Sequence, residues 1–185
     1  MTILIKNGRL INPSENLDKV MDIFVEDGII KEKAETIDRQ ADSVIDAKGC
    51  YVMPGLIDLH VHFRDPGLTY KEDIETGSKA AAKGGFTTVC CMPNTKPVVD
   101  NVETVKYIIE KGEKTGLTNV LPVGAVTKNM AGIEITDVEE LKKAGICAIS
   151  EDGKSVMNSG VYRKAMKNAA KANVPVLAHC EDINL

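Results

Sequence analysis

The sequence has no tryptophan, and aromatic residues make up only 4% of its 185 residues. A hydrophobic core must therefore be built mainly from isoleucine, valine, leucine, methionine and alanine. No uncharged apolar run is long enough to cross a bilayer. The apolar stretch at the N-terminus is interrupted by Lys6 and Arg9 and lacks the hydrophobic segment of a signal peptide. We therefore expect a cytoplasmic protein.

The sequence also lacks an excess of basic charge, and it contains no cysteine motif. The formal net charge is −4, which argues against nucleic-acid binding, because proteins of that class usually carry a basic face. The five cysteines are odd in number and show no Cys-x-x-Cys spacing, so we expect reduced, mostly buried thiols rather than a disulfide framework. Cys180 lies beside His179 and is an alternative zinc ligand, but a buried thiol is the favoured interpretation.

The first 52 residues contain short apolar segments separated by turn residues. Asn7-Gly8 and Asp27-Gly28 follow two of these segments. Both dipeptides favour the positive φ angles of tight turns, so each is predicted to join two strands in a hairpin. The apolar segments are residues 3–5, 23–25 and 44–45. Residues 1–52 are therefore predicted to form a small β unit, too short to build a large core by itself.

From Met53 onward, predicted strands and helices alternate. The strands are residues 56–62, 87–92, 119–126, 146–150 and 174–179, and the helices begin near Thr69, Asp100, Thr136 and Ser159. This alternation predicts an α/β fold with a parallel sheet and right-handed crossovers. No glycine-rich phosphate motif follows the first strand, and a complete eight-stranded barrel takes ~250 residues. This region is therefore either a small open α/β domain or an unfinished barrel.

All three histidines fall at the carboxyl ends of predicted strands. His60 and His62 are two residues apart and so share one face of the first strand, and His179 ends the fifth. Glu151 and Asp152 follow the fourth. Because α/β proteins place their sites at this edge, we expect a metal centre, with Zn²⁺ favoured and Mn²⁺ or Fe²⁺ as alternatives. Taken alone, a His-x-His pair more often consists of two polar residues at a strand end that bind nothing.

Two further polar side chains are candidates for the same cavity. Arg64 has the parity of His60 and His62, and it reaches the cavity if the strand stays regular. Asn94 follows Pro93 at the end of the second strand, where the proline restricts the turn. Asn94 is thus placed to hydrogen-bond a substrate carboxylate, although a simple turn asparagine is the alternative.

Several motifs resemble those of a known enzyme family. Pro-Gly-Leu-Ile-Asp-Leu-His-Val-His at 54–62 resembles the first-strand signature of cyclic-amide hydrolases, which include dihydroorotases, allantoinases and dihydropyrimidinases. Phe-Arg-Asp-Pro-Gly at 63–67, Gly-Phe-Thr-Thr at 85–88, Met-Pro-Asn-Thr at 92–95 and Ala-His-Cys-Glu-Asp at 178–182 narrow this to bacterial-type dihydroorotases of the amidohydrolase superfamily. The resemblance covers essentially the whole chain.

The resemblance implies a (β/α)8 TIM-type barrel preceded by a small β-sandwich. Residues 1–52 would be the N-terminal part of the sandwich domain, and residues 53–185 the first part, about five strands, of an incomplete metal-dependent hydrolase barrel. Barrels of this family take one more histidine ligand from strand six and an acid/base aspartate from strand eight. We therefore expect no catalytic acid/base within this chain, and an isolated chain that is inactive and self-associates.

The resemblance also implies one or two Zn²⁺ ions at the barrel mouth. His60 and His62 match ligands of the more buried metal, Asp152 matches a carboxylate that contacts or bridges the metals, and His179 matches a ligand of the second metal. The family's usual Ser-Asp-Asp-Gly motif is Ser-Glu-Asp-Gly here, at 150–153. Glu151 therefore competes with Asp152, since a bulge would change which acid faces inward.

The implied reaction is the reversible cyclisation of N-carbamoyl-L-aspartate to L-dihydroorotate in de novo pyrimidine biosynthesis. Arg64 and Asn94 match the residues that hold the substrate's carboxylate. The alternatives are another cyclic amidase, such as an allantoinase or hydantoinase, and a non-catalytic dihydroorotase-like subunit. A homodimer and association with aspartate carbamoyltransferase are the implied protein partners, and neither nucleic acid nor membrane is expected as a partner.

Overall fold

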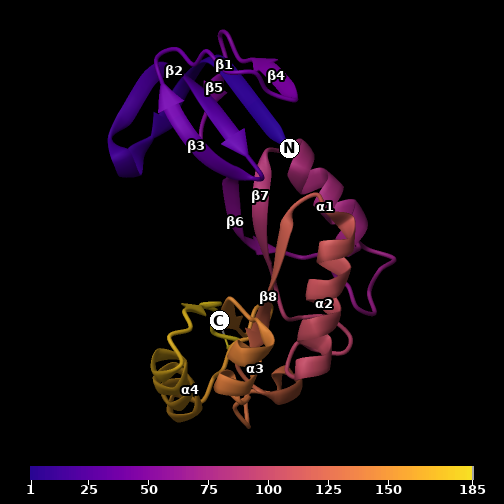
Figure 1. Ribbon diagram of the computed structural model, residues 1–185. Helices are drawn as coiled ribbons and strands as arrows, with labels where there is room; N and C mark the ends of the chain where they lie inside the picture. Colours follow the sequence, from indigo (N-terminus) through magenta and orange to yellow (C-terminus); the bar gives the residue numbers. More distant parts are fainter. Residues whose placement is uncertain (185) are drawn as a thin grey trace. The chain divides into compact units, whose positions relative to one another are not determined.

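The structure, a computed structural model, describes residues 1–184, so Leu185, the last residue of the predicted barrel segment, lies outside the described part. The chain divides into two compact units, Met1–Pro54 and Gly55–Leu185 (Figure 1). Among residues 1–184, no helix has the length and apolar character needed to span a membrane.

The first unit is built on one five-stranded mixed sheet. Its long strand β1 (Thr2–Asn12) pairs antiparallel with β2 (Leu17–Glu26) and parallel with both β4 (Ser43–Asp46) and β5 (Tyr51–Val52). β3 (Ile29–Ala34) pairs antiparallel with β2, and a short 3-10 turn, Pro13–Glu15, links β1 to β2. The buried cluster of this unit is small, with Leu4, Phe24 and Ile37 at its centre, as expected for so short a segment.

Only one of the two predicted hairpin turns joins two strands. Asp27 and Gly28 have φ angles of 51° and 77° and connect β2 to β3, as predicted. Asn7 also has a positive φ, 62°, but β1 continues through it and its register against β2 shifts there. The hairpin prediction at Asn7-Gly8 is therefore wrong. The dipeptide forms a bulge, for which a positive φ is equally suitable, and the Asn7 amide donates to Asp22 Oδ1 at 2.9 Å.

The second unit contains a parallel sheet with strand order β10-β9-β8-β7-β6. Its strands are β6 (Leu56–Val61), β7 (Phe86–Cys91), β8 (Asn119–Ala125), β9 (Ala148–Ser150) and β10 (Val176–Leu177). The helices between them are α1 (Ile74–Lys83), α2 (Val102–Thr115), α3 (Val138–Ala144) and α4 (Ser159–Lys171), with a short 3-10 turn, Lys128–Met130, after β8. Parallel strands in sequential order, the first four each followed by a helix, are arranged as in a (β/α)8 barrel. The predicted fold class is confirmed.

Helices α1, α2 and α3 begin later than predicted. Asp73 caps α1 in place of Thr69, Asn101 caps α2 in place of Asp100, and Asp137 caps α3 in place of Thr136. Each of these side chains accepts a hydrogen bond from a backbone amide of the first helical turn. Asp and Asn are at least as effective as Thr as N-terminal caps. The sequence alone therefore could not distinguish the candidate caps, and the path of each strand-to-helix loop selected one of them.

The main core of the second unit lies between the sheet and its helices. α1 and α2 lie side by side against β7 and β8 (Figure 1). Fully buried members of this core include Val89, Val105, Ile108, Leu141 and Ile149. Burying each such side chain contributes about 1.5–3 kcal/mol. The opposite face of the sheet holds a second buried cluster of Cys90, Met92, Val123 and Ala148, because successive side chains of a strand alternate between faces.

Candidate metal centre

The carboxyl ends of β6 and β9 bring His60, His62 and Asp152 together. His60 Nε2 lies 3.2 Å from Asp152 Oδ1, and His62 Nε2 lies 3.3 Å from Asp152 Oδ2. The two Nε2 atoms are 3.3 Å apart. One potential ligand atom from each residue falls within 4.8 Å of the other two. Atoms this close can share one ion, so the geometry fits a single metal bound by all three side chains.

Burial and charge at this group also suit a cation. The side chain of Asp152 is 6% exposed, that of His62 31% and that of His60 52%. A buried carboxylate is unfavourable unless it is paired or binds a metal. Burial lowers the pKa of His62, and the positive charge of Arg64 lowers it further. His62 is therefore neutral at pH 7, which is the form that binds a metal. Two imidazoles and a buried carboxylate are a donor set that fits a divalent metal.

His179 approaches the same carboxylate from the end of β10. Its Nδ1 lies 3.4 Å from Asp152 Oδ1, and its Nε2 lies 2.7 Å from Glu181 Oε2. His179 is not among the three residues whose ligand atoms form the tight group. Asp152 is thus the side chain shared by His60, His62 and His179. The partnership between His179 and Glu181 was not predicted, although their spacing of two residues was visible in the sequence.

Asn94 lies inside the centre and contacts two of the candidate ligands. Its Oδ1 lies 3.0 Å from His62 Nδ1, and its Nδ2 donates to Asp152 Oδ2 at 3.1 Å. Because Nδ2 is the donor, Oδ1 is left to accept from a protonated His62 Nδ1, and His62 Nε2 keeps a free lone pair. A second partner of this kind fixes both the tautomer and the ring orientation of a ligand histidine. This role was missed in the sequence, because no local spacing relates the end of β7 to β6 or β9.

The neighbouring acid, Glu151, points elsewhere. It is buried, and one of its carboxylate oxygens accepts from the amides of Val126 and Thr127 at 3.1 and 3.0 Å. The Thr127 hydroxyl donates to the other oxygen. Glu151 therefore holds the loop that follows β8, and Asp152 is the acid that contacts the imidazoles. Both acids lie beyond the end of β9 at Ser150, so the contacts with other segments, rather than strand alternation, decide the choice left open by the sequence.

Arg64 lies near the centre, but the reason predicted for its position does not hold. β6 ends at Val61, and Arg64 itself has a φ of 57°, so the strand is not regular as far as this residue. Arg64 is half-buried, and after burial its positive charge is the second cause that lowers the pKa of His62. The turn of the chain, rather than strand parity, brings the two together.

The cysteines are free, as expected, but not all are buried. Cys90 and Cys91 are buried, whereas Cys50 and Cys180 are exposed. Burial raises the pKa of the Cys147 thiol to about 12, so this group is unreactive at neutral pH. Because Cys180 is exposed, the buried-thiol interpretation of this residue is wrong. The chain beyond β10 lies at the surface there, and Cys180 is not among the residues grouped around the possible metal position.

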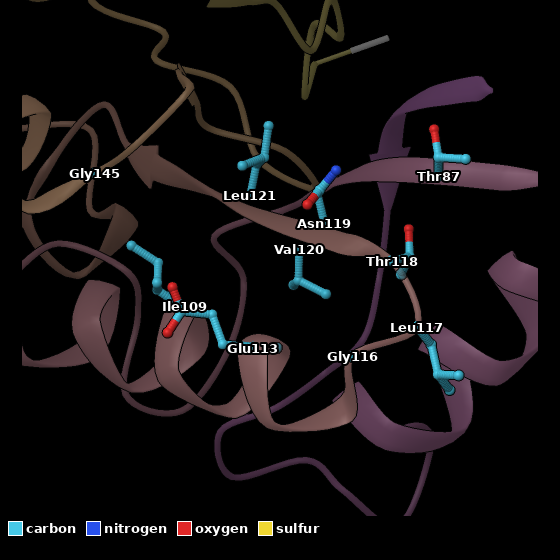
Figure 2. A pocket seen from close by; sticks show the side chains of 11 residues that line it. Thr87, Ile109, Glu113, Gly116, Leu117, Thr118, Asn119, Val120, Leu121 and Gly145 are labelled. Atoms are coloured by element: carbon cyan, nitrogen blue, oxygen red, sulfur yellow. The ribbon is translucent and has the colours of Figure 1, made fainter. Parts of the chain in front are cut away.

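One cavity in the described part of the chain lies away from these residues. It has a volume of about 520 Å³ and lies where α2 turns into β8, at the amino-terminal end of the sheet. Figure 2 shows Leu117, Thr118 and Asn119 along this turn, with Ile109 and Glu113 on the adjoining helix. In barrels of this type, chemistry occurs at the carboxyl ends of the strands, and the opposite end serves stability. This cavity is not a candidate active site.

Comparison with known proteins agrees with the motifs. A family model described as Dihydro-orotase-like matches residues 49–185. The dihydroorotase of Ruminiclostridium cellulolyticum is 51% identical over 185 residues, which are 100% of this chain and 43% of that protein. The dihydroorotase of Aquifex aeolicus is also 51% identical over 185 residues, 100% of this chain and 44% of that protein. The chain thus spans less than half the length of these relatives.

Solved structures show the same fold. The L-hydantoinase (dihydropyrimidinase) from Arthrobacter aurescens superposes with a TM-score of 0.79 and 26% identity, covering 97% of this chain and 41% of that one. The D-hydantoinase from a Thermus species gives a TM-score of 0.77 and 29% identity, covering 99% of this chain and 41% of that one. The resemblance read from the motifs is confirmed by the family match and by the identity over the whole chain: this chain belongs to the dihydroorotase-like family.

Proposed function

We propose that the protein containing these residues is a dihydroorotase, which interconverts N-carbamoyl-L-aspartate and L-dihydroorotate. The observation that carries this proposal is the group of His60, His62 and Asp152 at the carboxyl edge of the sheet, in a chain 51% identical to dihydroorotases. Hydrolysis or closure of a cyclic amide needs an activated water and a polarised carbonyl, which a metal at such an edge can provide.

Zn²⁺ is the metal that these donors suit best. Imidazole nitrogen and carboxylate oxygen are common zinc ligands, and a catalytic site keeps a position open for water or substrate. His60, His62 and Asp152 would hold one ion. His179, which approaches the same carboxylate at 3.4 Å, would help to hold a second. When bound, the metal supplies Lewis-acid polarisation of the amide carbonyl and lowers the pKa of a water.

The remaining roles belong to residues around this group. Asn94 keeps His62 in one tautomer and orients Asp152 through the hydrogen bonds described above. Arg64 would bind the substrate's carboxylate, because a planar guanidinium offers two parallel donors to it. Transfer of a proton to the ring nitrogen needs an acid/base. We assign that role to no residue of this chain, since the resemblance implies an aspartate from a later strand.

Two alternatives differ in how they explain Arg64 and the histidines. A hydantoinase would share the fold of the solved relatives, but hydantoin has no free carboxylate for Arg64 to bind. A scaffolding subunit has no need for a set of metal-binding side chains, which this chain retains. A homodimer and association with aspartate carbamoyltransferase are further predictions that rest on the resemblance alone, and a cytoplasmic location is a prediction from the sequence.

The test of the proposed function is a substrate comparison with the metal-loaded protein expressed from its complete reading frame. We expect kcat/KM for dihydroorotate to exceed that for hydantoin or allantoin by at least ~10²-fold, because a site built around a charged partner rejects analogues that lack it. Comparable turnover of hydantoin would favour the cyclic-amidase alternative. A purified protein without metal and without turnover would favour the scaffold.

Residues 1–185 expressed alone are expected to lack activity and to self-associate. β6 lies at one edge of the described sheet, and its Leu56, Ile57 and Leu59 are 45%, 61% and 58% exposed. An apolar edge strand invites pairing with another chain. Loss of an acid/base alone lowers a rate by ~10²–10⁴-fold. Activity assays combined with light scattering test this prediction, and turnover by a clean monomer would contradict both parts of it.

A further inference from the structure

A buried aspartate ties the loop after β6 to helix α2. The side chain of Asp65 is 0% exposed, and Lys111 Nζ lies 2.6 Å from its Oδ2. The Tyr107 hydroxyl donates to Asp65 Oδ1 at 2.9 Å, and the Ile74 amide donates to Oδ2 at 3.2 Å. Tyr107 and Lys111 are one helical turn apart on α2 and also contact each other at 3.3 Å. The carboxylate is thus held from two helices.

This cluster takes no part in the metal centre. None of its members belongs to the group around Asp152, and Asp65 directs both oxygens toward α1 and α2. A buried ion pair adds little net stability compared with apolar side chains of similar volume, because the charges must be desolvated. The three donors fix the position of the Asp65 carboxylate, and this position matters for the residue beside it.

The residue next to Asp65 is Arg64, and its backbone is strained. A φ of 57° for a residue other than glycine costs on the order of 1–2 kcal/mol, and it persists only where the surroundings hold it. The Arg64 carbonyl accepts from the Leu68 amide at 2.9 Å, which closes the loop on itself. The direction of the Arg64 side chain therefore depends on how firmly this loop is held.

The same loop packs against the loop that carries Asn94. The Lys96 amide donates to the Pro66 carbonyl at 3.1 Å. Gly67 approaches so closely that a Cβ atom there would lie 1.9 Å from the Lys96 carbonyl oxygen. The loops after β6 and β7 therefore form one packed unit, which contains both predicted carboxylate-binding residues. Asp65 is the point at which this unit is fastened to α2.

We propose that Tyr107 and Lys111 are positioning residues that act through Asp65 to hold Arg64 in the orientation that binds the substrate's carboxylate. The substrate part of this inference rests on the proposed function. If either partner of Asp65 is removed, a buried carboxylate loses a hydrogen bond, and the loop gains alternative conformations. Arg64 is then in its binding orientation for a smaller fraction of the time, and the apparent affinity falls by that fraction. Neither residue contacts reacting atoms, so kcat is affected little.

The kinetic test uses Tyr107→Phe and Lys111→Met in the metal-loaded protein from the complete reading frame. We expect KM for dihydroorotate to rise by ~3–10-fold, the factor by which the competent fraction falls, with kcat and metal content nearly unchanged. Lys111→Arg keeps the positive charge beside Asp65, so KM of this variant should stay close to the wild-type value. In an Arg64→Met background, Tyr107→Phe should add nothing, because the two changes act on one interaction. Tyr70→Phe and Lys106→Met, at exposed positions, are the matched controls.

A second measurement does not depend on the reaction. Backbone hydrogen exchange at the Leu68 and Lys96 amides should quicken by about tenfold or more in Tyr107→Phe and Lys111→Met, whereas exchange at Val89 in β7 should not change. Unchanged hydrogen exchange at the Leu68 and Lys96 amides would overturn the proposal that Asp65 anchors this loop to α2. Faster exchange with an unaltered KM would overturn its link to Arg64, and a parallel loss of kcat and metal would show a general structural role instead. A wild-type protein that fails to turn over dihydroorotate would refute the proposed function. The hydrogen-exchange result would still show whether Tyr107 and Lys111 hold the loop through Asp65.

Discussion

Replacement of His60 by alanine is expected to abolish tight metal binding and, with it, the activity. His60 supplies one of the two Nε2 atoms beside Asp152, and an alanine leaves that corner of the group without a donor. Loss of a mere supporting partner costs a metal site 10–100-fold in affinity, so loss of a ligand should cost more than ~10²-fold. Metal analysis after dialysis against a graded chelator measures the effect.

Two variants calibrate the result for His60. Asn94→Ala removes only the partner of His62 and Asp152, so it should weaken metal binding by about 10–100-fold, an intermediate effect. Asn119→Ala, at the start of β8 and far along the strand from these residues, should leave the metal content unchanged. Full retention of metal by His60→Ala would refute the assignment of this group as the metal centre.

Arg64→Met should raise KM for carbamoyl-aspartate or dihydroorotate by well over tenfold. A charge-assisted hydrogen-bonded pair contributes about 1.5–3 kcal/mol, which corresponds to roughly 10–150-fold in affinity. Methionine keeps much of the length of the side chain but offers the carboxylate no donor. The metal should remain bound, since a guanidinium is a cation that offers only donors and is therefore not a metal ligand.

Steady-state kinetics and metal analysis of the same preparation test this prediction. Arg163→Met, on the exposed surface of α4, is the matched loss of a guanidinium and should leave KM unaltered. An unchanged KM in Arg64→Met would mean that the side chain points away from the substrate, and loss of metal together with the rise in KM would indicate a role in supporting the centre instead. Because Tyr107 and Lys111 are proposed to act through Arg64, Arg64→Met is also the background against which the double variant with Tyr107→Phe is compared.

Much of the second unit was predictable because its signals are local. The alternation of apolar strands with helices led to the correct order and type of elements. The pair His60 and His62 could be assigned to one face, because side chains two apart on a strand always share it. The ends of helices were less predictable, since Thr136 and Asp137 are both good caps. The Thr136 hydroxyl instead donates to the Ala125 carbonyl at 2.7 Å, a contact across the loop that no local pattern encodes.

The candidate site was predictable as a set of residues but not as a set of contacts. The rule that parallel strands end at one edge predicts that His60, His62, Asp152 and His179 lie at the same place. The same rule does not specify atoms. It led to the prediction that Asn94 binds the substrate, but it gave no sign that Asn94 also contacts His62 and Asp152.

The sequence by itself determined the family, the order of strands and helices and the edge at which the histidines meet, because these depend on motifs and on the periodicities of strand and helix. Only the tertiary structure decided that Asp152 rather than Glu151 faces the imidazoles, and that Arg64 lies in a turn whose next residue, Asp65, is contacted by Tyr107 and Lys111. Those outcomes depend on hydrogen bonds and ion pairs between residues far apart in the sequence, such as His60 with Asp152 and Tyr107 with Asp65. Such bonds form only after separate strands have packed, so no window of sequence contains them.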